Sequence, residues 1–353
     1  MKPLAKITLA LWLGLLSAGC HTSAAADQTT PKAPAYKAAA GPHKVTNATY
    51  DWQDEARRRD VPVRIYYPET GEGPFPVIIF SHGLGGSRDG YRYLGLHWAS
   101  HGYVSVHLQH KGSDRDVLKG KLRLKKAMRD SIADPRNAIN RPLDVRFAID
   151  QMEKMNGEDT PLKGRLDLRR VGMAGHSFGA WTTLAAAGQV FVTRLGKEIT
   201  LSDPRVKAAI PMSAPPPRKK EHYEKAFSRI RIPCFHMTGT LDDSVIVDTK
   251  AADRRVPFDH TDGADQFLVV FKDGDHMIFS GRLFDFLGRR KSDALFQNLI
   301  RQSSAAFWDM YLKGDDKARA WLAGGGFEAV LGKNGAFEKK LKEVHLVPVR
   351  SSR

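Results

Sequence analysis

The chain has 353 residues, of which 42% are hydrophobic and 27% are charged, the composition of a globular protein with a sizeable core. Its 55 Lys and Arg residues outnumber 39 Asp and Glu residues, which favours anionic surfaces as partners or simply solubility. No aromatic interleaving or groove-reading motif accompanies this charge, so we expect no nucleic-acid partner.

The N-terminus is predicted to be an export signal over residues 1–26. Two lysines precede the uncharged run 7–16, which is too short for a membrane span and the right length for a signal-peptide core. Residues 17–20 resemble a bacterial lipoprotein box, which would place a lipid on Cys20 and attach the protein to the outer membrane. Cleavage after the alanines at 24–26 is the alternative. We therefore expect an exported bacterial protein that is periplasmic, lipid-anchored or secreted.

The rest of the chain is predicted to be a flexible linker and one domain. Residues 27–44 are rich in Ala, Thr, Pro and Lys, as in a tether. No later break in composition is deep enough for a second core, so residues 45–353 are expected to form a single domain with a C-terminal helical tail. The second cysteine, Cys234, is expected to be a small core residue.

Short apolar or β-branched runs recur along the domain, and helix-length segments separate most of them. Residues 144–155, for example, place four apolar side chains on one face of a helix. Continuous apolar strands that alternate with amphipathic helices indicate an α/β fold, with a mostly parallel, eight-stranded sheet covered on both faces. The strands are expected at 45–52, 63–67, 77–80, 103–106, 171–174, 206–212, 234–238 and 267–271.

Ser177 is the strongest candidate for chemistry. It lies in Gly175-His176-Ser177-Phe178-Gly179, directly after a predicted strand and before the small-residue helix 180–187. In this context G-x-S-x-G describes a nucleophile elbow, a strained turn that lifts the hydroxyl above the sheet. Side chains at the two glycines would collide with the neighbouring strand and helix. The alternative is an ordinary turn serine.

A serine needs a base and a group that orients the base. In such a fold the acid and then the histidine follow the serine along the chain, each after a later strand. Asp242 follows the strand at 234–238 and is the expected acid, with Asp243 as the alternative; two solvated turn aspartates would suit a non-enzyme. His276 follows the last strand and is the expected base.

Two backbone N–H groups are expected to stabilise an oxyanion. Residues 81–86, Ser-His-Gly-Leu-Gly-Gly, follow the strand at 77–80, where an oxyanion loop belongs. We assign the donors to Leu84 and Phe178. His82 is expected to order this loop rather than to take part in the chemistry.

These motifs, in this order, resemble the α/β-hydrolase superfamily, over about residues 61–322. The similarity is greatest to its dienelactone-hydrolase-like branch, to platelet-activating-factor acetylhydrolases and to bacterial polyester hydrolases. It includes the H-G-x-G-G loop, Arg141-Pro142-x-Asp144, G-H-S-F-G and the late helix end around 306–315. True dienelactone hydrolases use cysteine at the position of Ser177. The resemblance implies an exported serine esterase that forms an acyl-enzyme and needs no cofactor or metal.

Histidine pairs at helical spacing, His97 with His101 and His107 with His110, could suggest zinc. The first pair lacks the glutamate of H-E-x-x-H, and neither has an evident third ligand, so no metal site is expected. There is no dinucleotide-binding fingerprint either.

The sequence says little about the substrate. The basic segments 109–140 and 213–220 leave the catalytic edge and could hold an anionic substrate or face solvent, and 281–296 could form an apolar rim near His276. We expect short acyl or aryl esters as substrates. The alternatives are a polyester or cutin hydrolase, a prolyl-oligopeptidase-like peptidase, against which the lack of a preceding propeller argues, and an inactive binding module.

Overall fold

The computed structural model describes residues 34–120, 122–193, 195–244, 246–280 and 292–342. Its main feature is a nine-stranded sheet with the strand order β1-β2-β4-β3-β5-β8-β9-β10-β11. A separate hairpin pairs β6 (Val190–Val192) with β7 (Glu198–Thr200). The strands of the main sheet are β1 (Val45–Asp54), β2 (Arg59–Pro68), β3 (Phe75–Ser81), β4 (Val104–Leu108), β5 (Leu166–His176), β8 (Val206–Met212), β9 (Cys234–Leu241), β10 (Gln266–Asp275) and β11 (Gly335–Lys340).

The six central strands, from β4 to β10, run parallel, whereas β1, β2 and β11 pair antiparallel with their neighbours. The mostly parallel sheet and the α/β-hydrolase fold expected from the sequence are confirmed. The sheet has one strand more than the eight expected. The additional strand, β11, pairs with β10 at the edge of the sheet, from Gln266 opposite Lys340 to Phe271 opposite Gly335.

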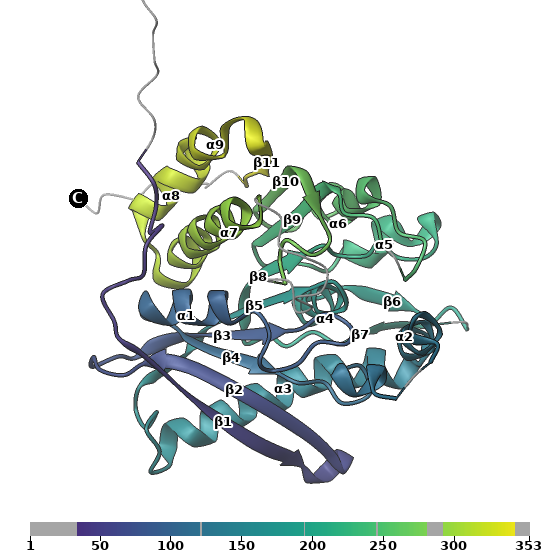
Figure 1. The fold of residues 1–353 in the computed structure, drawn as a ribbon, viewed down its shortest axis with the longest axis horizontal. Coiled ribbons are helices and arrows are strands. Elements are labelled where there is room, and N and C mark those ends of the chain that lie inside the picture. Colours follow the sequence, from purple (N-terminus) through teal and green to yellow (C-terminus); the bar gives the residue numbers. More distant parts are fainter. Residues whose placement is uncertain (1–33, 121, 194, 245, 281–291, 343–353) are drawn as a thin grey trace, which may run out of the picture. The chain divides into compact units, whose positions relative to one another are not determined.

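Helices cover both faces of this sheet (Figure 1). On one face α1, α7, α8 and α9 contribute to one apolar cluster, and on the other α3 and α4 contribute to two more. The helices are α1 (Arg92–Ser100), α2 (Leu124–Ala133), α3 (Pro135–Gly157), α4 (Phe178–Ala187), α5 (Tyr223–Phe227), α6 (Val256–Asp259), α7 (Asp293–Trp308), α8 (Asp316–Ala323) and α9 (Gly326–Leu331).

Strand β3 illustrates why the central strands read as continuous apolar runs. Ile78 and Phe80 point to the cluster under α1 and α7, whereas Val77 and Ile79 point to the cluster under α3. Successive side chains of a strand point to opposite faces, so a strand covered on both faces must be apolar at every position.

The expected linker lies partly within the described residues. Residues 34–44 contact the domain: the Tyr36 hydroxyl donates to Asp309 (2.9 Å), and the Gly41 amide donates to Ser100 (2.8 Å). This part therefore packs against the domain rather than hanging free from it. The expected signal peptide, with Cys20, lies outside the described residues. Across the described ranges, no helix is both long and apolar enough to cross a membrane.

The carboxyl ends of the parallel strands bring the candidate site residues to one edge of the sheet. Ser177 directly follows β5, Ser213 follows β8, Asp242 follows β9 and His276 follows β10. This edge is where open α/β sheets bind ligands.

Candidate active site

Ser177 occupies a sharp turn between β5 and α4. Its backbone angles, φ 57° and ψ −115°, lie in a region that a residue with a side chain rarely adopts. A Cβ at Gly179 would collide with the carbonyl of Ser81, and one at Gly175 would collide with the backbone of Gly179. The turn thus needs both glycines, for the steric reason expected from the sequence, and it sets Ser177 at the N-terminus of α4.

Ser177, His276 and Asp242 form a continuous hydrogen-bonded chain. The Ser177 hydroxyl lies 3.0 Å from Nε2 of His276, and Nδ1 of His276 lies 2.6 Å from Oδ1 of Asp242. Asp242 and Ser177 lie 34 and 99 positions from His276 in the sequence, yet both contact its imidazole ring. The arrangement suits proton transfer from the hydroxyl to the ring, with the carboxylate fixing the tautomer that leaves Nε2 free to accept.

The structure distinguishes between the two neighbouring aspartates. Asp242 is fully buried, whereas the Asp243 side chain is exposed and accepts a hydrogen bond from the Ala251 amide (2.8 Å). Burial raises the pKa of Asp242, but hydrogen bonds from His276 and Ser213 and the nearby charge of Arg254 outweigh it, so the pKa lies below its ordinary value. Asp242 is therefore held ionised beside the imidazole.

Three residues that the sequence analysis did not identify support Asp242. The Ser213 hydroxyl donates to Oδ1 (2.8 Å) and the Thr238 hydroxyl donates to Oδ2 (2.8 Å). Arg254 donates to the backbone carbonyls of Asp242 (3.2 Å) and Ser213 (3.0 Å). Only the positions of Ser213 and Thr238, at or near the ends of β8 and β9, could have suggested these contacts.

The two expected oxyanion donors lie at the same edge. Phe178 is the first residue of α4, where a backbone N–H has no partner within the helix. Among the described residues, the amides of Leu84 and Phe178 have no hydrogen-bond acceptor, whereas those of Gly85 and Gly86 are bonded to Ser113 and Gly83. Both amides are thus available to a ligand, and the helix dipole of α4 favours negative charge there.

The loop that carries Leu84 is held by buried histidines. Nδ1 of His82 donates to the Gly83 carbonyl (2.6 Å), and its Nε2 accepts from the His110 amide (3.0 Å). Burial, with the Arg141 charge, lowers the pKa of His82 well below its ordinary value, so the ring is neutral. His82 therefore orders the loop through both ring nitrogens.

His176 lies behind His276, with 4.7 Å between the ring centroids. Its Nδ1 accepts from the Tyr91 hydroxyl (2.8 Å), which in turn accepts from the Gly83 amide (3.3 Å). Burial lowers the pKa of His176 well below its ordinary value, and the charge of His276 adds to the effect. A neutral His176 thus packs against the candidate base without competing with it for a proton.

The described residues of the basic segment 109–140 form part of the site's surroundings. The segment is hydrogen-bonded to the oxyanion loop through the backbone: the Gly85 amide donates to the Ser113 carbonyl (2.9 Å), and the Arg115 amide donates to the Gly86 carbonyl (2.9 Å). From α2, Arg129 donates to the Ile246 carbonyl (3.0 Å), in the loop after Asp242. The segment thus contacts both the oxyanion loop and the loop that follows Asp242. Of the apolar rim expected at 281–296, residues 281–291 lie outside the described residues, and Phe296 packs in the core instead.

The two histidine pairs considered as possible zinc ligands contact other side chains of the fold. His97 and His101 contact each other edge to face, whereas His107 bonds Ser105 (3.1 Å) and His110 bonds Asp144 (2.9 Å). Within the described ranges, no three histidine, cysteine or acidic side chains are grouped as metal ligands.

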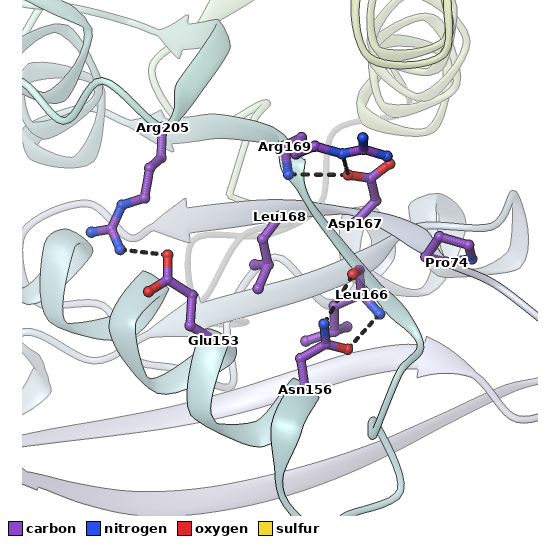
Figure 2. Close-up of a pocket in the computed structure, with 8 residues that line it drawn as sticks. All are labelled: Pro74, Glu153, Asn156, Leu166, Asp167, Leu168, Arg169 and Arg205. Carbon is purple, nitrogen blue, oxygen red and sulfur yellow. Dashed lines mark hydrogen bonds and ion pairs between the residues drawn. The ribbon is translucent and has the colours of Figure 1, made fainter.

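A shallow pocket lies at the opposite edge of the sheet, where the parallel strands begin (Figure 2). Leu166 to Arg169, at the start of β5, line it, together with Glu153 and Asn156 from α3 and with Arg205. There Arg205 donates a hydrogen bond to the Glu153 carboxylate (2.9 Å). None of the candidate catalytic residues lines this pocket.

The chain is similar to known ester hydrolases of two kinds. A family described as platelet-activating factor acetylhydrolase, isoform II, matches residues 69–118. The platelet-activating factor acetylhydrolase of Cavia porcellus is 24% identical over 72% of this chain and 61% of its own length. The dog enzyme of the same name is 26% identical over 34% of this chain and 33% of its own length.

Cutinases match as well. Cutinase 2 of Thermobifida cellulosilytica is 26% identical over 53% of this chain and 55% of its own length. The matches therefore span between a third and 61% of these relatives. They confirm the resemblance stated from the motifs.

Proposed function

Because this chain has the α/β-hydrolase fold and is similar to acetylhydrolases and cutinases, we propose that it is a serine carboxylic-ester hydrolase. The observation that carries the proposal is the unbroken chain of hydrogen bonds from Ser177 through His276 to Asp242. A strained serine at a helix N-terminus, with a base that is itself oriented by a buried carboxylate, is what nucleophilic catalysis of acyl transfer requires.

In the proposed reaction, the Ser177 oxygen attacks the ester carbonyl while Nε2 of His276 takes the hydroxyl proton. The tetrahedral oxyanion is stabilised by the amides of Leu84 and Phe178. When this intermediate collapses, the C–O bond to the alcohol breaks and His276 returns the proton to the departing oxygen, leaving an acyl-Ser177 ester. Water, deprotonated by His276, then attacks the acyl carbon; when this second intermediate collapses, the bond to the Ser177 oxygen breaks, His276 returns the proton to that oxygen and the acid is released. Asp242 stabilises the imidazolium in both halves.

We expect short acyl or aryl esters as substrates, in keeping with the word acetylhydrolase in the names of two relatives. The test is a p-nitrophenyl ester series on the purified protein. Acetate and butyrate should be hydrolysed and palmitate should not. A preference for palmitate would overturn this assignment of chain length while leaving the esterase proposal intact.

A polyester hydrolase is the second candidate, favoured by the similarity to cutinases. It uses the same site and differs in requiring access for a polymer chain. Release of soluble acids from a polyester film by the wild type, and none by Ser177→Ala, would support it. Activity on soluble esters without release from the film would limit the enzyme to small substrates.

We further propose that residues 1–26 direct export, with either a lipid on Cys20 or cleavage after Ala26. Mass spectrometry of the mature N-terminus distinguishes the two, since a diacylglyceryl cysteine and a free Asp27 differ in mass and in sequence. An uncleaved Met1 in protein recovered from cells would contradict both.

A further inference from the structure

Arg141 of α3 is fully buried beside the candidate oxyanion hole. Its guanidinium makes four hydrogen bonds: to the hydroxyls of Thr182 (2.9 Å), Ser113 (2.8 Å) and Ser81 (3.0 Å), and to the backbone carbonyl of His82. These partners come from four parts of the chain, so one side chain joins α3 to β3, the oxyanion loop, the basic segment and α4.

The partners of Arg141 are all neutral. No carboxylate among the described residues lies within salt-bridge distance of it, although Asp144 is one helical turn away. Asp144 instead pairs with Arg59 (2.8 Å), Arg57 (2.8 Å) and His110 (2.9 Å). Asp144 and Asp114 act on the Arg141 charge only from beyond ion-pair distance, and burying an arginine without a carboxylate in direct contact is costly.

Both expected oxyanion donors lie next to groups that Arg141 holds. The His82 carbonyl that it binds lies two residues before Leu84. Its guanidinium also stacks over the Phe178 ring, 4.4 Å from the centroid, and binds Thr182, one turn further along the same helix. A shift of either backbone segment would therefore break contacts with Arg141.

We propose that Arg141 is a positioning residue that fixes the amides of Leu84 and Phe178 relative to each other and whose charge, with no carboxylate in direct contact, favours the oxyanion. This inference rests on the proposed esterase function. Preorganised donors stabilise a transition state because they need no rearrangement when charge develops. Burial lowers the pKa of Arg141 to about 9, so the guanidinium still carries its charge at neutral pH.

The test compares Arg141→Lys and Arg141→Met with wild type on p-nitrophenyl acetate. Lysine keeps a charge but cannot make four diverging hydrogen bonds, and methionine keeps neither. We expect kcat to fall about 10-fold to 100-fold in the lysine variant and further in the methionine variant, with KM within about threefold of wild type. Affinity for an arylboronic acid, whose serine adduct places an oxygen in the oxyanion hole, should fall in parallel with kcat.

Arg205→Lys is the matched control. Arg205 pairs with Asp150 and Glu153 of α3 and with Asp203 in the turn before β8, and it lines the pocket at the other edge of the sheet (Figure 2). Its replacement should lower thermal stability and leave kcat and boronate affinity unchanged. Equal kcat losses in the Arg141→Lys and Arg205→Lys variants would assign Arg141 a merely structural role and overturn the inference.

If the Arg141 variants do not fold, Ser113→Ala and Thr182→Val remove one acceptor each. Both should lower kcat about twofold to tenfold, the effect of one lost hydrogen bond. Wild-type kcat in both variants would contradict the inference. An inactive wild type that a fluorophosphonate does not label would instead overturn the proposed function, so the two failures are distinguishable.

Discussion

Two buried arginines, Arg254 and Arg141, each lie one contact away from the candidate catalytic groups, but their surroundings differ. Arg254 lies 3.6 Å from the Asp242 carboxylate and donates to two backbone carbonyls of the acid's side of the site. Arg141, on the oxyanion side, has only neutral partners among the described residues. On the acid side, around Asp242, the buried arginine thus lies within ion-pair distance of a carboxylate. On the oxyanion side, around the expected amide donors, the buried arginine has no carboxylate in direct contact, and Asp144 and Asp114 act on it only from a greater distance.

This difference in the surroundings of the two arginines matches the role of each side in the proposed reaction. The acid keeps the same charge throughout, and a balanced environment holds it ionised. On the oxyanion side, a negative charge appears only in the transition state, so a buried cation with no carboxylate in direct contact interacts more strongly with that state than with the substrate. Changes to the two sides should therefore have different kinetic signatures.

The largest expected effect comes from Asp242→Asn on the acid side. The amide cannot hold His276 in the tautomer that accepts the serine proton, and kcat should fall about 10⁴-fold. Asp243→Asn is the matched control and should stay close to wild type, because its exposed side chain bonds the Ala251 amide and pairs with Lys250 rather than contacting His276. Steady-state kinetics on p-nitrophenyl butyrate measures both. A greater loss in Asp243→Asn would reassign the acid.

The second expected effect is on stability and concerns the oxyanion side. Burial lowers the pKa of His110 to about 3, and hydrogen bonds from His110 and Arg59 outweigh burial to lower that of Asp144 to about 2. Below about pH 6.5 the unfolded chain protonates His110 before the folded protein does, and below about pH 4 the same holds for Asp144. The free energy of unfolding should therefore decrease as the pH is lowered through these ranges, by about 1.4 kcal/mol per pH unit for each group.

Urea unfolding between pH 7 and 4 measures this dependence. His110→Asn removes one of the buried imidazoles, so its stability should fall less steeply than that of the wild type over this range. A wild-type unfolding free energy that is flat from pH 7 to 4.5 would contradict the assignment of neutral, buried histidines to this side.

Replacing Arg254 tests whether the acid side depends on its arginine in the way proposed. Arg254→Met removes the bonds to the carbonyls of Asp242 and Ser213 and the charge that helps keep the carboxylate ionised. We expect a kcat about tenfold lower, with boronate affinity reduced less than in Arg141→Met. The same reduction of boronate affinity in both variants would erase the distinction between the two sides.

The smallest expected effect is that of Ser213→Ala. It removes one of three hydrogen bonds to the Asp242 carboxylate, while those of Thr238 and His276 remain. A kcat about twofold to tenfold lower, with KM unchanged, is expected from the loss of one hydrogen bond. A loss as large as that of Asp242→Asn would make Ser213 an essential member of the site.

The sequence predicted the central strands because each is covered on both faces and must be apolar at every position, as in β3. Ser177 was predicted as the nucleophile because its turn leaves a local pattern of glycines. Asp242 and His276 were predicted as its partners because parallel strands bring successive turns to one edge, and the structure does place the three side chains in contact. These features depend on short stretches of sequence and on topology.

What was missed depends on contacts between distant residues or on weak local signals. Strand β11, GAFEKK, is short and half polar and pairs at an edge, so it lacks the apolar run of a central strand. Residues 34–44 read as a tether, but specific contacts such as Tyr36 with Asp309 hold them. The motif Arg141-Pro142-x-Asp144 was noticed, yet nothing local indicates that its two charges bind different partners.

Fluorophosphonate labelling followed by peptide mass spectrometry tests the central claim, an activated serine at position 177, most directly. We predict a single labelled peptide, modified at Ser177, in the wild type, no labelling in Ser177→Ala, and strongly slowed labelling in His276→Ala. Labelling that persists in Ser177→Ala, or a folded wild type that the reagent does not label, would contradict the account.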